Sequence, residues 1–499
     1  MLRSDHTPSI LLSDLAKLVG ASSPDLHITG AVMDNRAVRS GDLFIAMPGE
    51  RVHAARFASD AVDAGAVAVV TDAEGAQIAG DLSVPVIVVP DVAAIAGTLA
   101  AAAYGMPARH LRSFAVTGTN GKTTTTFMID SILSKLGATT GLIGTVELRL
   151  AGQTFPARMT TPQPDELQAT LEVLRERGGT DLVMEVSSHA LAQGRTRPIC
   201  FTVAGFTNLT QDHLDFHETF EDYFAAKKAL FDTANSSRCV ITVDDKYGQR
   251  LFDEVSRERD GVVALSLHGN AAPGGWNVSE IIEAEHGHSF TLTDPTGRHM
   301  RTSVTLPAIF NVANAALAIA MVVESGVSFD ELCAVVADGI SPIVPGRMEV
   351  VARQPRVVVD FAHNEDALAK AMDGLGTVDG RLIVVTGSAG DRDKGKRPAM
   401  ARVVSERADL TVITDDDPHY EDPGAIRRDL ISGIVEGAQW REIADRREAI
   451  RWAIDYAGPA DTVLLAGRGH ETTQNYGDFF IDIDDREVAR TCVKEKNEQ

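Results

Sequence analysis

The fold is decided by the stretch Thr117-Gly-Thr-Asn-Gly-Lys-Thr-Thr-Thr, residues 117–125. It follows the short apolar run Phe114-Ala-Val and opens a helical pattern. Gly118 and Gly121 allow backbone N–H groups to turn toward an anion, and the N-terminus of a helix adds a favourable dipole. Lys122 can reach the β- and γ-phosphates of a nucleotide. This order of strand, glycine-rich loop and helix predicts a nucleotide-binding site.

The same loop contains a candidate magnesium ligand and one departure from the usual phosphate loop. Thr123 follows the lysine, and its hydroxyl suits Mg²⁺. The usual pattern places four residues between its first glycine and its Gly-Lys pair, whereas only Thr119 and Asn120 stand there in this chain. A tight strand–helix turn with a chance lysine is the alternative interpretation. The strand before the loop and the helix to about Leu136 after it favour nucleotide binding.

The composition is that of a folded protein with several domains. The chain has 499 residues, which at roughly 100–200 residues per domain predicts about three domains. Lys and Arg number 47 and Asp and Glu number 70, so the formal net charge is −23. Such an acidic protein is a poor general binder of nucleic acid or of anionic membranes. We therefore expect neither as a partner, and a phosphate ligand must be held by local groups.

Targeting and redox signals predict a cytoplasmic protein. The cysteines Cys200, Cys239, Cys333 and Cys492 are far apart and show no metal-ligand spacing, which favours a reducing compartment. The N-terminal stretch lacks the apolar core of a signal peptide. The sequence also lacks a run of about 18 apolar residues, the length that a membrane span needs.

Alternating strand and helix patterns predict an α/β protein of three domains. Breaks at Tyr104-Gly-Met-Pro, at Pro342 and at Pro345-Gly346 mark the boundaries. The predicted units are an N-terminal α/β domain over 1–106, a central P-loop domain over 107–343 and a C-terminal Rossmann-like domain over 344–499. In the last two units, apolar runs alternate with helical stretches, as in a parallel sheet covered by helices. Residues from about 262 to 305 have the pattern of antiparallel hairpins instead.

Eight further stretches, together with the phosphate loop, match the motifs of a known family. They are, in order, Met184-Glu-Val-Ser-Ser-His, Thr207-Asn-Leu-Thr-Gln-Asp-His-Leu-Asp-Phe-His, Tyr223-Phe-Ala-Ala-Lys, Asn311-Val-Ala-Asn-Ala, Pro345-Gly-Arg-Met-Glu, Asp360-Phe-Ala-His, Gly387-Ser-Ala-Gly-Asp-Arg-Asp-Lys-Gly-Lys-Arg-Pro and Ala466-Gly-Arg-Gly-His-Glu. Together with the phosphate loop they resemble the Mur ligase family, and the C-terminal pair is most similar to its MurE type.

The resemblance implies an ATP-dependent amide ligase of peptidoglycan precursor synthesis. Such an enzyme adds the third residue, a diamino acid, to UDP-N-acetylmuramoyl-L-alanyl-D-glutamate through an acyl phosphate. The UDP-linked substrate would lie between the N-terminal and central domains, and the amino acid in the C-terminal domain. The resemblance further suggests a monomer.

Phosphoryl transfer needs charge neutralisation and alignment, which the resemblance assigns to residues of the central domain. The catalytic residues would be Lys122, Glu185, His213 and Lys227, and the Mg²⁺ ligands Thr123, Glu185, His213 and Lys227. Glu185 ends the apolar run Leu182-Val-Met, so its carboxylate should emerge at the sheet edge. Lys227 would be carbamylated by CO₂, which makes it a carboxylate-like ligand. By residue type alone it would be a surface lysine, and Lys228 would be an ordinary exposed helix residue.

The resemblance places ATP across the central and C-terminal domains. The residues expected to bind it are Gly118, Thr119, Asn120, Gly121, Lys122, Thr123, Thr124, Asn311, Arg347 and Asp360. Asn311 matches an adenine contact and Arg347 a phosphate contact, whereas Asp360 at a strand end suits a ribose hydroxyl. Helix capping is the alternative role of Asn311 and Asn314. Because Arg347 and Asp360 belong to the C-terminal unit, the chemistry should require domain closure.

Six residues match family positions that hold the UDP-sugar-peptide, namely Asn35, Thr160, Thr161, Ser187, Gln193 and Arg195. Arg195 suits this role because a guanidinium pairs bidentately with a carboxylate. Asn35 stands in Asp34-Asn-Arg, where the family has Asp-Ser-Arg. His53-Ala-Ala-Arg-Phe stands where the family often has Asp-Gly-His before a phenylalanine, so details of the uridine pocket should differ.

The amino acid that is added should contact Arg392, Asp416, Asp417, His419, Gly467 and Glu471. Family members that add meso-diaminopimelate have Asp-Asn-Pro-Arg where this chain has Asp416-Asp-Pro-His. An imidazole is a weaker carboxylate clamp than a guanidinium, and Asp417 adds negative charge that favours a distal ammonium. We therefore predict L-lysine, with meso-diaminopimelate and L-ornithine as alternatives. Arg392 would hold the α-carboxylate, and Asp416 and Glu471 would receive amino groups.

Three other functions are compatible with parts of the pattern. Folylpolyglutamate synthase shares the expected fold, but the N-terminal unit and the Asp416-Asp-Pro-His stretch argue against it. A P-loop kinase or NTPase would turn over ATP without needing both a carboxylate substrate and an amine. A non-catalytic binder of peptidoglycan precursors would not need intact Lys122, Glu185 and Lys227.

Overall fold

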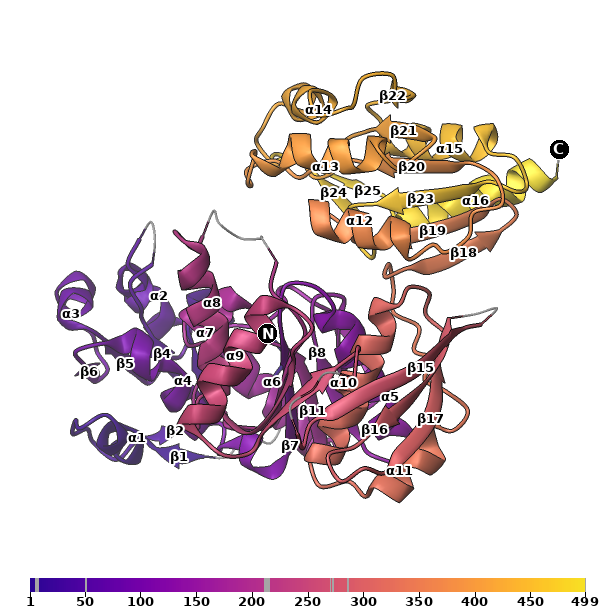
Figure 1. Ribbon diagram of the computed structural model, residues 1–499. Helices are drawn as coiled ribbons and strands as arrows, with labels where there is room; N and C mark the ends of the chain where they lie inside the picture. The colour runs from indigo at the N-terminus through magenta and orange to yellow at the C-terminus, as the bar shows by residue number, and fades with distance from the viewer. Residues whose placement is uncertain are drawn as a thin grey trace.

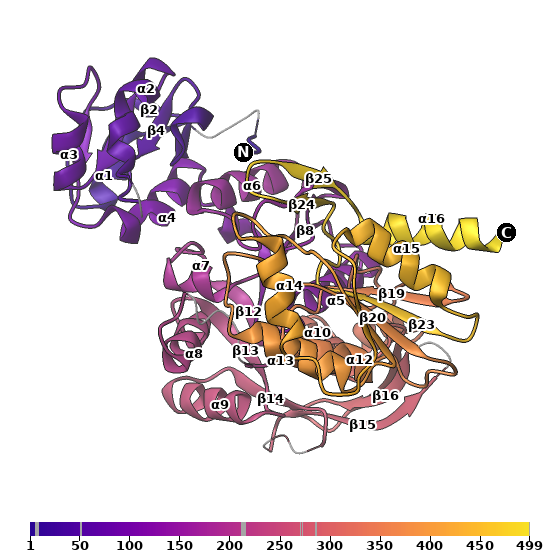
Figure 2. The ribbon, with the colours of Figure 1, turned by 90° about the horizontal axis from the view of Figure 1, so that it is seen from above.

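Three α/β units follow one another along the chain in the computed structural model (Figure 1). The structure describes residues 1–4, 9–49, 52–210, 216–269, 271, 273–284 and 287–498. The main sheets of the three units have four, 11 and six strands in chain order. Seen from above, the N-terminal unit lies to one side of the central unit and the C-terminal unit lies over it (Figure 2). In the described part of the chain, no helix combines the length and apolar character that crossing a membrane requires.

The N-terminal unit is built on four parallel strands in the order β3-β4-β5-β6. Its elements are β1 (Ile10–Leu11), α1 (Leu12–Leu18), β2 (His27–Ile28), β3 (Gly30–Val32), η1 (Asn35–Ala37), β4 (Asp42–Ile45), η2 (Ala54–Phe57), α2 (Ala58–Asp63), β5 (Ala68–Thr71), α3 (Ala73–Ala79), β6 (Val86–Val88), α4 (Val92–Ala103) and η3 (Pro107–His110). Strands β4 and β5 are buried along their length, as apolar strands covered on both faces are.

The central unit contains the sheet of 11 strands, in the order β10-β9-β8-β11-β7-β12-β13-β14-β15-β16-β17. Its elements are β7 (Arg112–Thr117), α5 (Lys122–Lys135), β8 (Thr140–Ile143), β9 (Glu147–Leu150), β10 (Gln153–Pro156), α6 (Pro164–Glu176), β11 (Asp181–Glu185), α7 (Ser188–Ala192), β12 (Phe201–Phe206), α8 (Phe220–Lys228), η4 (Ala229–Phe231), β13 (Ser236–Thr242), α9 (Lys246–Glu258), β14 (Val262–Ser266), β15 (Trp276–Glu283), β16 (His288–Thr293), β17 (His299–Val304), α10 (Phe310–Glu324) and α11 (Phe329–Val336).

Strand β14 shows that the prediction of antiparallel hairpins over 262–305 is wrong for its first part. Strands β15, β16 and β17 are antiparallel, as predicted. By contrast, β14 pairs in parallel with β13 and with β15. The helix α9 separates β13 from β14, and such a crossover returns the chain to run in the same direction as before. The parallel part of the sheet therefore extends further than the turn signals indicated.

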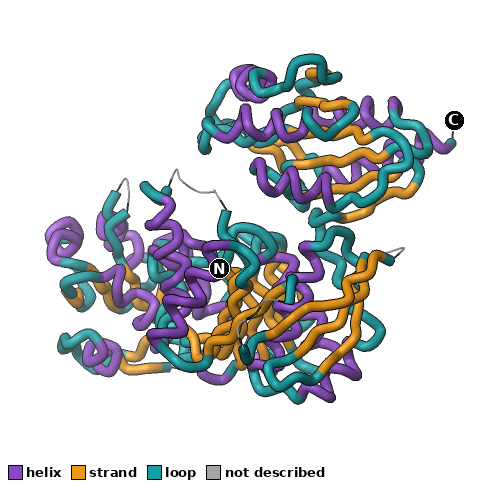
Figure 3. The backbone as a smooth tube through the Cα atoms, viewed as in Figure 1, coloured by secondary structure: helices purple, strands orange, loops and turns teal. Residues whose placement is uncertain are grey.

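The C-terminal unit has a six-stranded sheet in the order β18-β19-β23-β20-β21-β22, parallel except at the edge strand β18. Its elements are β18 (Glu349–Arg353), β19 (Arg356–Asp360), α12 (Glu365–Asp373), β20 (Leu382–Thr386), α13 (Lys396–Ser405), β21 (Leu410–Ile413), α14 (Pro423–Ile431), β22 (Trp440–Glu442), α15 (Arg446–Tyr456), β23 (Thr462–Ala466), β24 (Thr473–Asn475), β25 (Phe480–Asp482) and α16 (Asp485–Asn497). Helices lie on both faces of this sheet (Figure 3).

The elements around the phosphate loop agree with the sequence patterns. The strand predicted before the loop is β7, and the helix predicted after it is α5, which ends one residue before Leu136. The predicted α/β class is confirmed. The central sheet is parallel from β8 to β15 and antiparallel at both edges, and the C-terminal sheet is parallel except at β18. Parallel strands place their carboxyl ends at one edge, where ligands bind in such sheets.

A buried ion pair joins the last two long helices of the C-terminal unit. Arg446 of α15 and Asp485 of α16 are fully buried, and Arg446 Nη2 lies 2.7 Å from Asp485 Oδ2. We predict that Asp485→Ala lowers the free energy of unfolding by about 3–5 kcal/mol, because it leaves a buried guanidinium without its counter-charge. Urea denaturation followed by circular dichroism measures this.

The same two helices offer a matched control. Arg451 and Glu495 form an ion pair of 2.6 Å in which both side chains are about half exposed. Glu495→Ala should change the free energy of unfolding by less than about 1 kcal/mol. Equal effects of the two substitutions would contradict the assignment of stability to the buried pair.

Candidate active site

The phosphate loop lies between β7 and α5 and is held open by its backbone. Gly118 has φ +144°, and a Cβ at this position would lie 1.9 Å from Thr207 Oγ1, so only glycine fits. Lys122 begins α5 and donates hydrogen bonds from Nζ to the carbonyl oxygens of Gly118 (3.0 Å) and Thr119 (2.9 Å). The Lys122 ammonium therefore lies against the loop, at the N-terminus of α5. A phosphate bound in the loop would contact both the ammonium and the helix N-terminus.

Oxygen ligands suited to Mg²⁺ gather beside the loop. Thr123 Oγ1 donates a hydrogen bond of 2.9 Å to Glu185 Oε2, and Glu185 is buried at the carboxyl end of β11. Thr145 donates to the same carboxylate from its backbone N (2.8 Å) and its hydroxyl (3.1 Å). Hydroxyl and carboxylate oxygens are the ligands that Mg²⁺ prefers, so this donor set fits the ion. Thr145 was missed from sequence, although it follows β8, a strand of the same parallel sheet edge.

Lys227 is buried rather than on the surface. It lies on α8, its exposed fraction is 2%, and its Nζ donates a hydrogen bond of 2.8 Å to the carbonyl oxygen of Gly118. The same ammonium lies 4.6 Å from the centre of the Tyr223 ring, one helical turn earlier. The neighbouring Lys228 pairs with Glu254 and Glu258 on the outside of the unit. Predicted ligand His213 lies outside the described residues.

Six of the ten residues predicted to bind ATP line one cavity between the central and C-terminal units. Its walls include Asn120, Gly121, Thr124 and Asn311 of the central unit and Arg347 and Asp360 of the C-terminal unit. Asn311 and Asn314 are buried in α10 and hydrogen-bond to each other (3.1 Å). Neither caps the helix, because the N-cap of α10 is Ile309. Lys122 and Thr123 are on the loop beside this cavity.

Two side-chain contacts connect the C-terminal unit to the phosphate loop. Arg347 Nη2 donates to Thr123 Oγ1 (3.3 Å), and Asn120 Nδ2 donates to Asp366 Oδ2 (3.0 Å). The guanidinium of Arg347 also stacks on the Phe361 ring, 4.2 Å from its centre. Its Nε is buried and has no hydrogen-bond partner in the described part of the chain, which fits an anionic ligand. Burial lowers the pKa of Arg347, while the nearby carboxylates oppose this shift.

Asp360 supports the start of the C-terminal unit. Its two carboxylate oxygens accept backbone hydrogen bonds from Met348 (2.7 Å) and Ala362 (2.8 Å). Burial raises the pKa of Asp360, and Arg347 acts in the opposite direction. Both oxygens are therefore engaged with the backbone around Arg347, beside the cavity where a ribose contact was predicted.

Five of the six residues predicted for the UDP-sugar-peptide form a connected group. Thr161 Oγ1 donates to the carbonyl oxygen of Glu185 (3.0 Å) and accepts from the backbone N of Ser187 (3.1 Å). Arg195 donates from Nε to Gln193 Oε1 (2.8 Å) and from Nη1 to the carbonyl oxygen of Thr161 (3.1 Å). Thr160 joins the group through a 3.0 Å contact with the Thr145 hydroxyl. Thr161 thus connects Arg195 to the backbone of Glu185.

The sixth residue, Asn35, lies in the N-terminal unit, outside this connected group. It begins the short helix η1 directly after β3. The backbone N of Met33 donates a 2.8 Å hydrogen bond to Asp165 Oδ2, which is buried in the first turn of α6. A carboxylate is favoured at this end of a helix. Asp165 therefore links the end of β3 to the helix that follows Thr160 and Thr161.

All six residues predicted for the amino acid line a second cavity, which reaches the central unit at His189. They are Arg392, Asp416, Asp417, His419, Gly467 and Glu471. Ligand oxygens of Asp416, Asp417 and Glu471 lie within 4.8 Å of one another. Burial and these two aspartates raise the pKa of Glu471 to about 8. Asp417 Oδ1 accepts a hydrogen bond from the backbone N of Asn475 (3.0 Å), so one of its oxygens faces strand β24.

Comparison with known proteins finds matches over nearly the whole chain. Family models described as "Mur ligase family, catalytic domain", "Mur ligase middle domain" and "Mur ligase, glutamate ligase domain" match residues 27–104, 116–322 and 346–469. The UDP-N-acetylmuramoyl-L-alanyl-D-glutamate--2,6-diaminopimelate ligase of Streptomyces coelicolor is 41% identical over 99% of this chain and 97% of its own length.

The chain belongs to the Mur ligase family.

Two further comparisons place it within the Mur ligases. A UDP-N-acetylmuramyl-tripeptide synthetase of Leifsonia xyli subsp. xyli is 39% identical over 99% of this chain and 98% of its own length. A solved structure of a UDP-N-acetylmuramoyl-L-alanyl-D-glutamate--2,6-diaminopimelate ligase is 30% identical, with a TM-score of 0.68 over 98% of this chain and 100% of that chain. The predicted membership of the MurE type is confirmed.

The raised pKa of Glu471 leads to a prediction for this Mur ligase that needs no substrate. A folded-state pKa of about 8, above the ordinary value of 4.5, means that the folded protein binds an extra proton between these pH values. Stability is then lost as pH rises through this window. We predict that Glu471→Gln melts at a higher temperature than the unsubstituted protein at pH 9, with the difference disappearing at pH 4.

Thermal unfolding curves between pH 4 and pH 9 measure this effect. The control is Glu436→Gln, which changes an exposed glutamate of the same unit and should leave the pH dependence of the melting temperature as it is. A pH-independent difference between Glu471→Gln and the unsubstituted protein would show that Glu471 titrates normally.

Proposed function

We propose that this protein uses ATP to join a diamino acid to the D-glutamate of UDP-N-acetylmuramoyl-L-alanyl-D-glutamate in peptidoglycan precursor synthesis. The observation that carries the proposal is the position of the two cavities. The nucleotide cavity and the carboxylate-lined cavity share Phe361 and His363 as walls, beside Arg347. A phosphorylated intermediate made at the phosphate loop would therefore lie next to an incoming amine. The curated relatives, which act on this substrate by name, support the same reaction.

The reaction divides into two steps that these residues can serve. The D-glutamate carboxylate attacks the γ-phosphorus of ATP, which gives an acyl phosphate and releases ADP. The amine then attacks the acyl carbon, phosphate leaves, and the amide forms with loss of one proton. Lys122 and Arg347 neutralise charge on the transferred phosphoryl group, which is the main requirement of such a transfer. Mg²⁺ held by Thr123 and Glu185 would neutralise further phosphate charge.

The site residues are proposed in the roles expected from the sequence. Arg195, held by Gln193, orients the D-glutamate end of the substrate, and Asn35 contacts the uridine side. We also propose His213 and a carbamylated Lys227 as further metal ligands, and the domain boundaries 1–106, 107–343 and 344–499. Because ATP and UDP-linked precursors are cytoplasmic, we place the reaction in the cytoplasm. We also propose that the protein is a monomer.

We propose meso-diaminopimelate as the amino acid that is added. The names of the relatives favour this alternative over the L-lysine expected from sequence. The cavity also weakens the argument against a distal carboxylate, since one Asp417 oxygen accepts a hydrogen bond from the backbone N of Asn475. L-Lysine is the second candidate, because His419 stands where diaminopimelate ligases have arginine.

Phosphate release tests the function directly. The protein is mixed with ATP, Mg²⁺ and UDP-N-acetylmuramoyl-L-alanyl-D-glutamate, and meso-diaminopimelate, L-lysine or L-ornithine is added separately. We predict release that requires both the UDP-linked substrate and meso-diaminopimelate. Lys122→Ala should reduce the rate by roughly a hundredfold or more, because it removes a charge that stabilises the transition state. Release with L-lysine alone would keep the ligase and change its amino acid, and release without an amine would indicate an NTPase.

Carbamylation of Lys227 is tested by substitution and rescue. The ammonium first loses a proton to give the amine, and the amine then forms an N–C bond with CO₂ and releases a second proton. The cation is thereby replaced by a carbamate anion. We predict that Lys227→Ala abolishes phosphate release and that acetate or formate restores part of it by supplying a carboxylate. Lys228→Ala, which changes the adjacent lysine on the outside of α8, should retain full activity. Loss without rescue would leave Lys227 with a structural role only.

A further inference from the structure

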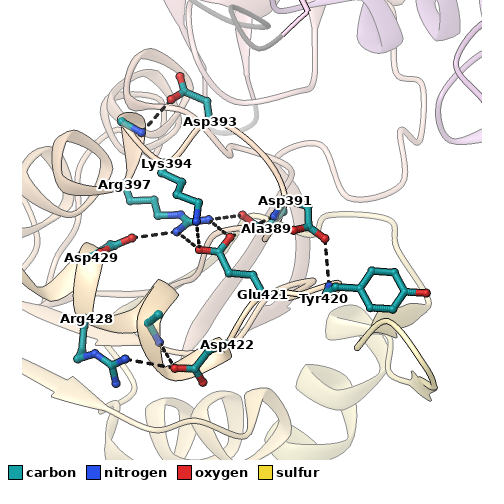
Figure 4. A network of polar contacts seen from close by, with 12 residues as sticks. Ala389, Asp391, Asp393, Lys394, Arg397, Tyr420, Glu421, Asp422, Arg428 and Asp429 are labelled. Carbon is teal, nitrogen blue, oxygen red and sulfur yellow. Dashed lines mark hydrogen bonds and ion pairs between the residues drawn. The ribbon is translucent and has the colours of Figure 1, made fainter. Parts of the chain in front are cut away.

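A network of ion pairs around the buried Arg397 joins the two loops that carry amino-acid-binding residues (Figure 4). The first loop, 387–395, follows β20 and carries Arg392. The second loop, 414–422, follows β21 and carries Asp416 and His419. Strands β20 and β21 are parallel neighbours, so both loops leave the same edge of the sheet. Neither loop contains a helix or a strand. Residues 474–476 also contact the second loop, so contacts between the two loops contribute to the width of the cavity.

Arg397 is the centre of the network. It lies on α13, its side chain is fully buried, and it donates from Nη1 to Glu421 Oε1 (2.9 Å) and from Nη2 to Glu421 Oε2 (2.8 Å). A two-point contact of this kind fixes direction as well as distance. The same guanidinium donates to the carbonyl oxygen of Ala389 (3.3 Å) and to Asp429 of α14 (2.9 Å). One side chain therefore holds both loops.

Glu421 also receives contacts from both sides of Arg392. Lys394 Nζ lies 2.9 Å from Glu421 Oε1, and the backbone N of Asp391 donates to Glu421 Oε2 (3.2 Å). In return, Asp391 Oδ2 accepts a hydrogen bond from the backbone N of Tyr420 (3.1 Å). The residues before and after Arg392 are thus connected to the second loop, as the dashed contacts in Figure 4 show.

Close packing of the two backbones makes this arrangement sensitive to small shifts. The backbone N of Gly390 donates a 2.8 Å hydrogen bond to the carbonyl oxygen of Asp417. A Cβ at Gly390 would lie 1.9 Å from the carbonyl oxygen of Pro418, so the loops meet where only glycine fits. A change in their separation would move Arg392 relative to Asp416 and His419 without altering any of these three residues.

We propose that Glu421 and Arg397 are positioning residues for the amino acid substrate. By holding the two loops at a fixed separation, they set the distance between the cation at Arg392 and the carboxylates that receive amino groups. The cavity then accepts an amino acid of one length in one orientation. This inference rests on the proposed ligase function and adds a specificity role to residues that do not touch the substrate.

Glu421→Gln tests the inference, since it keeps the shape of the side chain and removes its charge. We expect the KM for the amino acid to rise about tenfold or more, because a misplaced binding group costs affinity steeply. KM values for ATP and for the UDP-linked substrate, and kcat at saturating amino acid, should stay within about twofold. Arg397→Lys, which keeps the charge but loses the two-point contact, should give a smaller rise in the same KM.

Asp422→Asn is the matched control. Asp422 is adjacent to Glu421 but caps α14 and pairs with exposed Arg428, outside the contacts between the loops (Figure 4). Asparagine also caps helices well, so this variant should resemble the unsubstituted protein in every KM. Equal increases in all three KM values for Glu421→Gln would indicate a general folding defect and overturn the proposal, as would kinetics equal to those of Asp422→Asn.

Amide hydrogen exchange separates a failure of this inference from a failure of the proposed function. Glu421→Gln should speed exchange at the amides of Gly390 and Asp391, which donate to the second loop, and Asp422→Asn should not. Unchanged exchange would overturn the positioning role whether or not the protein is a ligase. Absence of amine-dependent turnover in the unsubstituted protein would refute the ligase function instead.

Discussion

Parallel strands bring functional side chains together only at their carboxyl ends, and the rest of this structure depends on that constraint. The central sheet presents the phosphate loop and Glu185 at such an edge, and the C-terminal sheet presents Asp360, Asp416 and Gly467 at another. Arg347 enters between the two edges, where it contacts Thr123 and stacks on Phe361. The phosphate loop of the central sheet therefore lies close to the side chains at the edge of the C-terminal sheet.

Local charge, rather than the net charge, makes an acidic protein suitable for phosphate chemistry. The formal charge of −23 would repel ATP, yet Lys122 and Arg347 lie at the nucleotide cavity, shielded in part from water. Electrostatic interactions are stronger in such surroundings than on the surface. The cavity proposed for the amino acid carries the opposite charge, because Asp416, Asp417 and Glu471 line it. Burial and the two aspartates raise the pKa of Glu471, and a bound ammonium group would lower it again.

Motifs whose residues are close in the sequence could be predicted, and the family resemblance also predicted which of them lie together in the fold. The phosphate loop follows from its glycines and its strand–helix context, and the six residues of the amino acid cavity follow from family motifs. Lys227 was harder to place, because a lysine on an amphipathic helix is usually exposed. Its ammonium lies against the Tyr223 ring of the same helix and donates to the Gly118 carbonyl, which only the fold brings close. The parallel pairing of β14 depends on the crossover through α9, which turn signals do not report.

Contacts between loops that are distant in the sequence could not be predicted either, because they too depend on the fold. Glu421 and Arg397 each have an ordinary charged side chain, and only the fold brings them into a buried two-point pair. Buried pairs of this kind gain little stability relative to apolar residues, since desolvation opposes the attraction, so their value lies in geometry. In this protein the geometry is the width of the amino acid cavity. Because the two loops are held together, the groups that line this cavity keep one orientation relative to Phe361 and His363, which line both cavities. The amine would then meet the acyl phosphate in an orientation set beforehand.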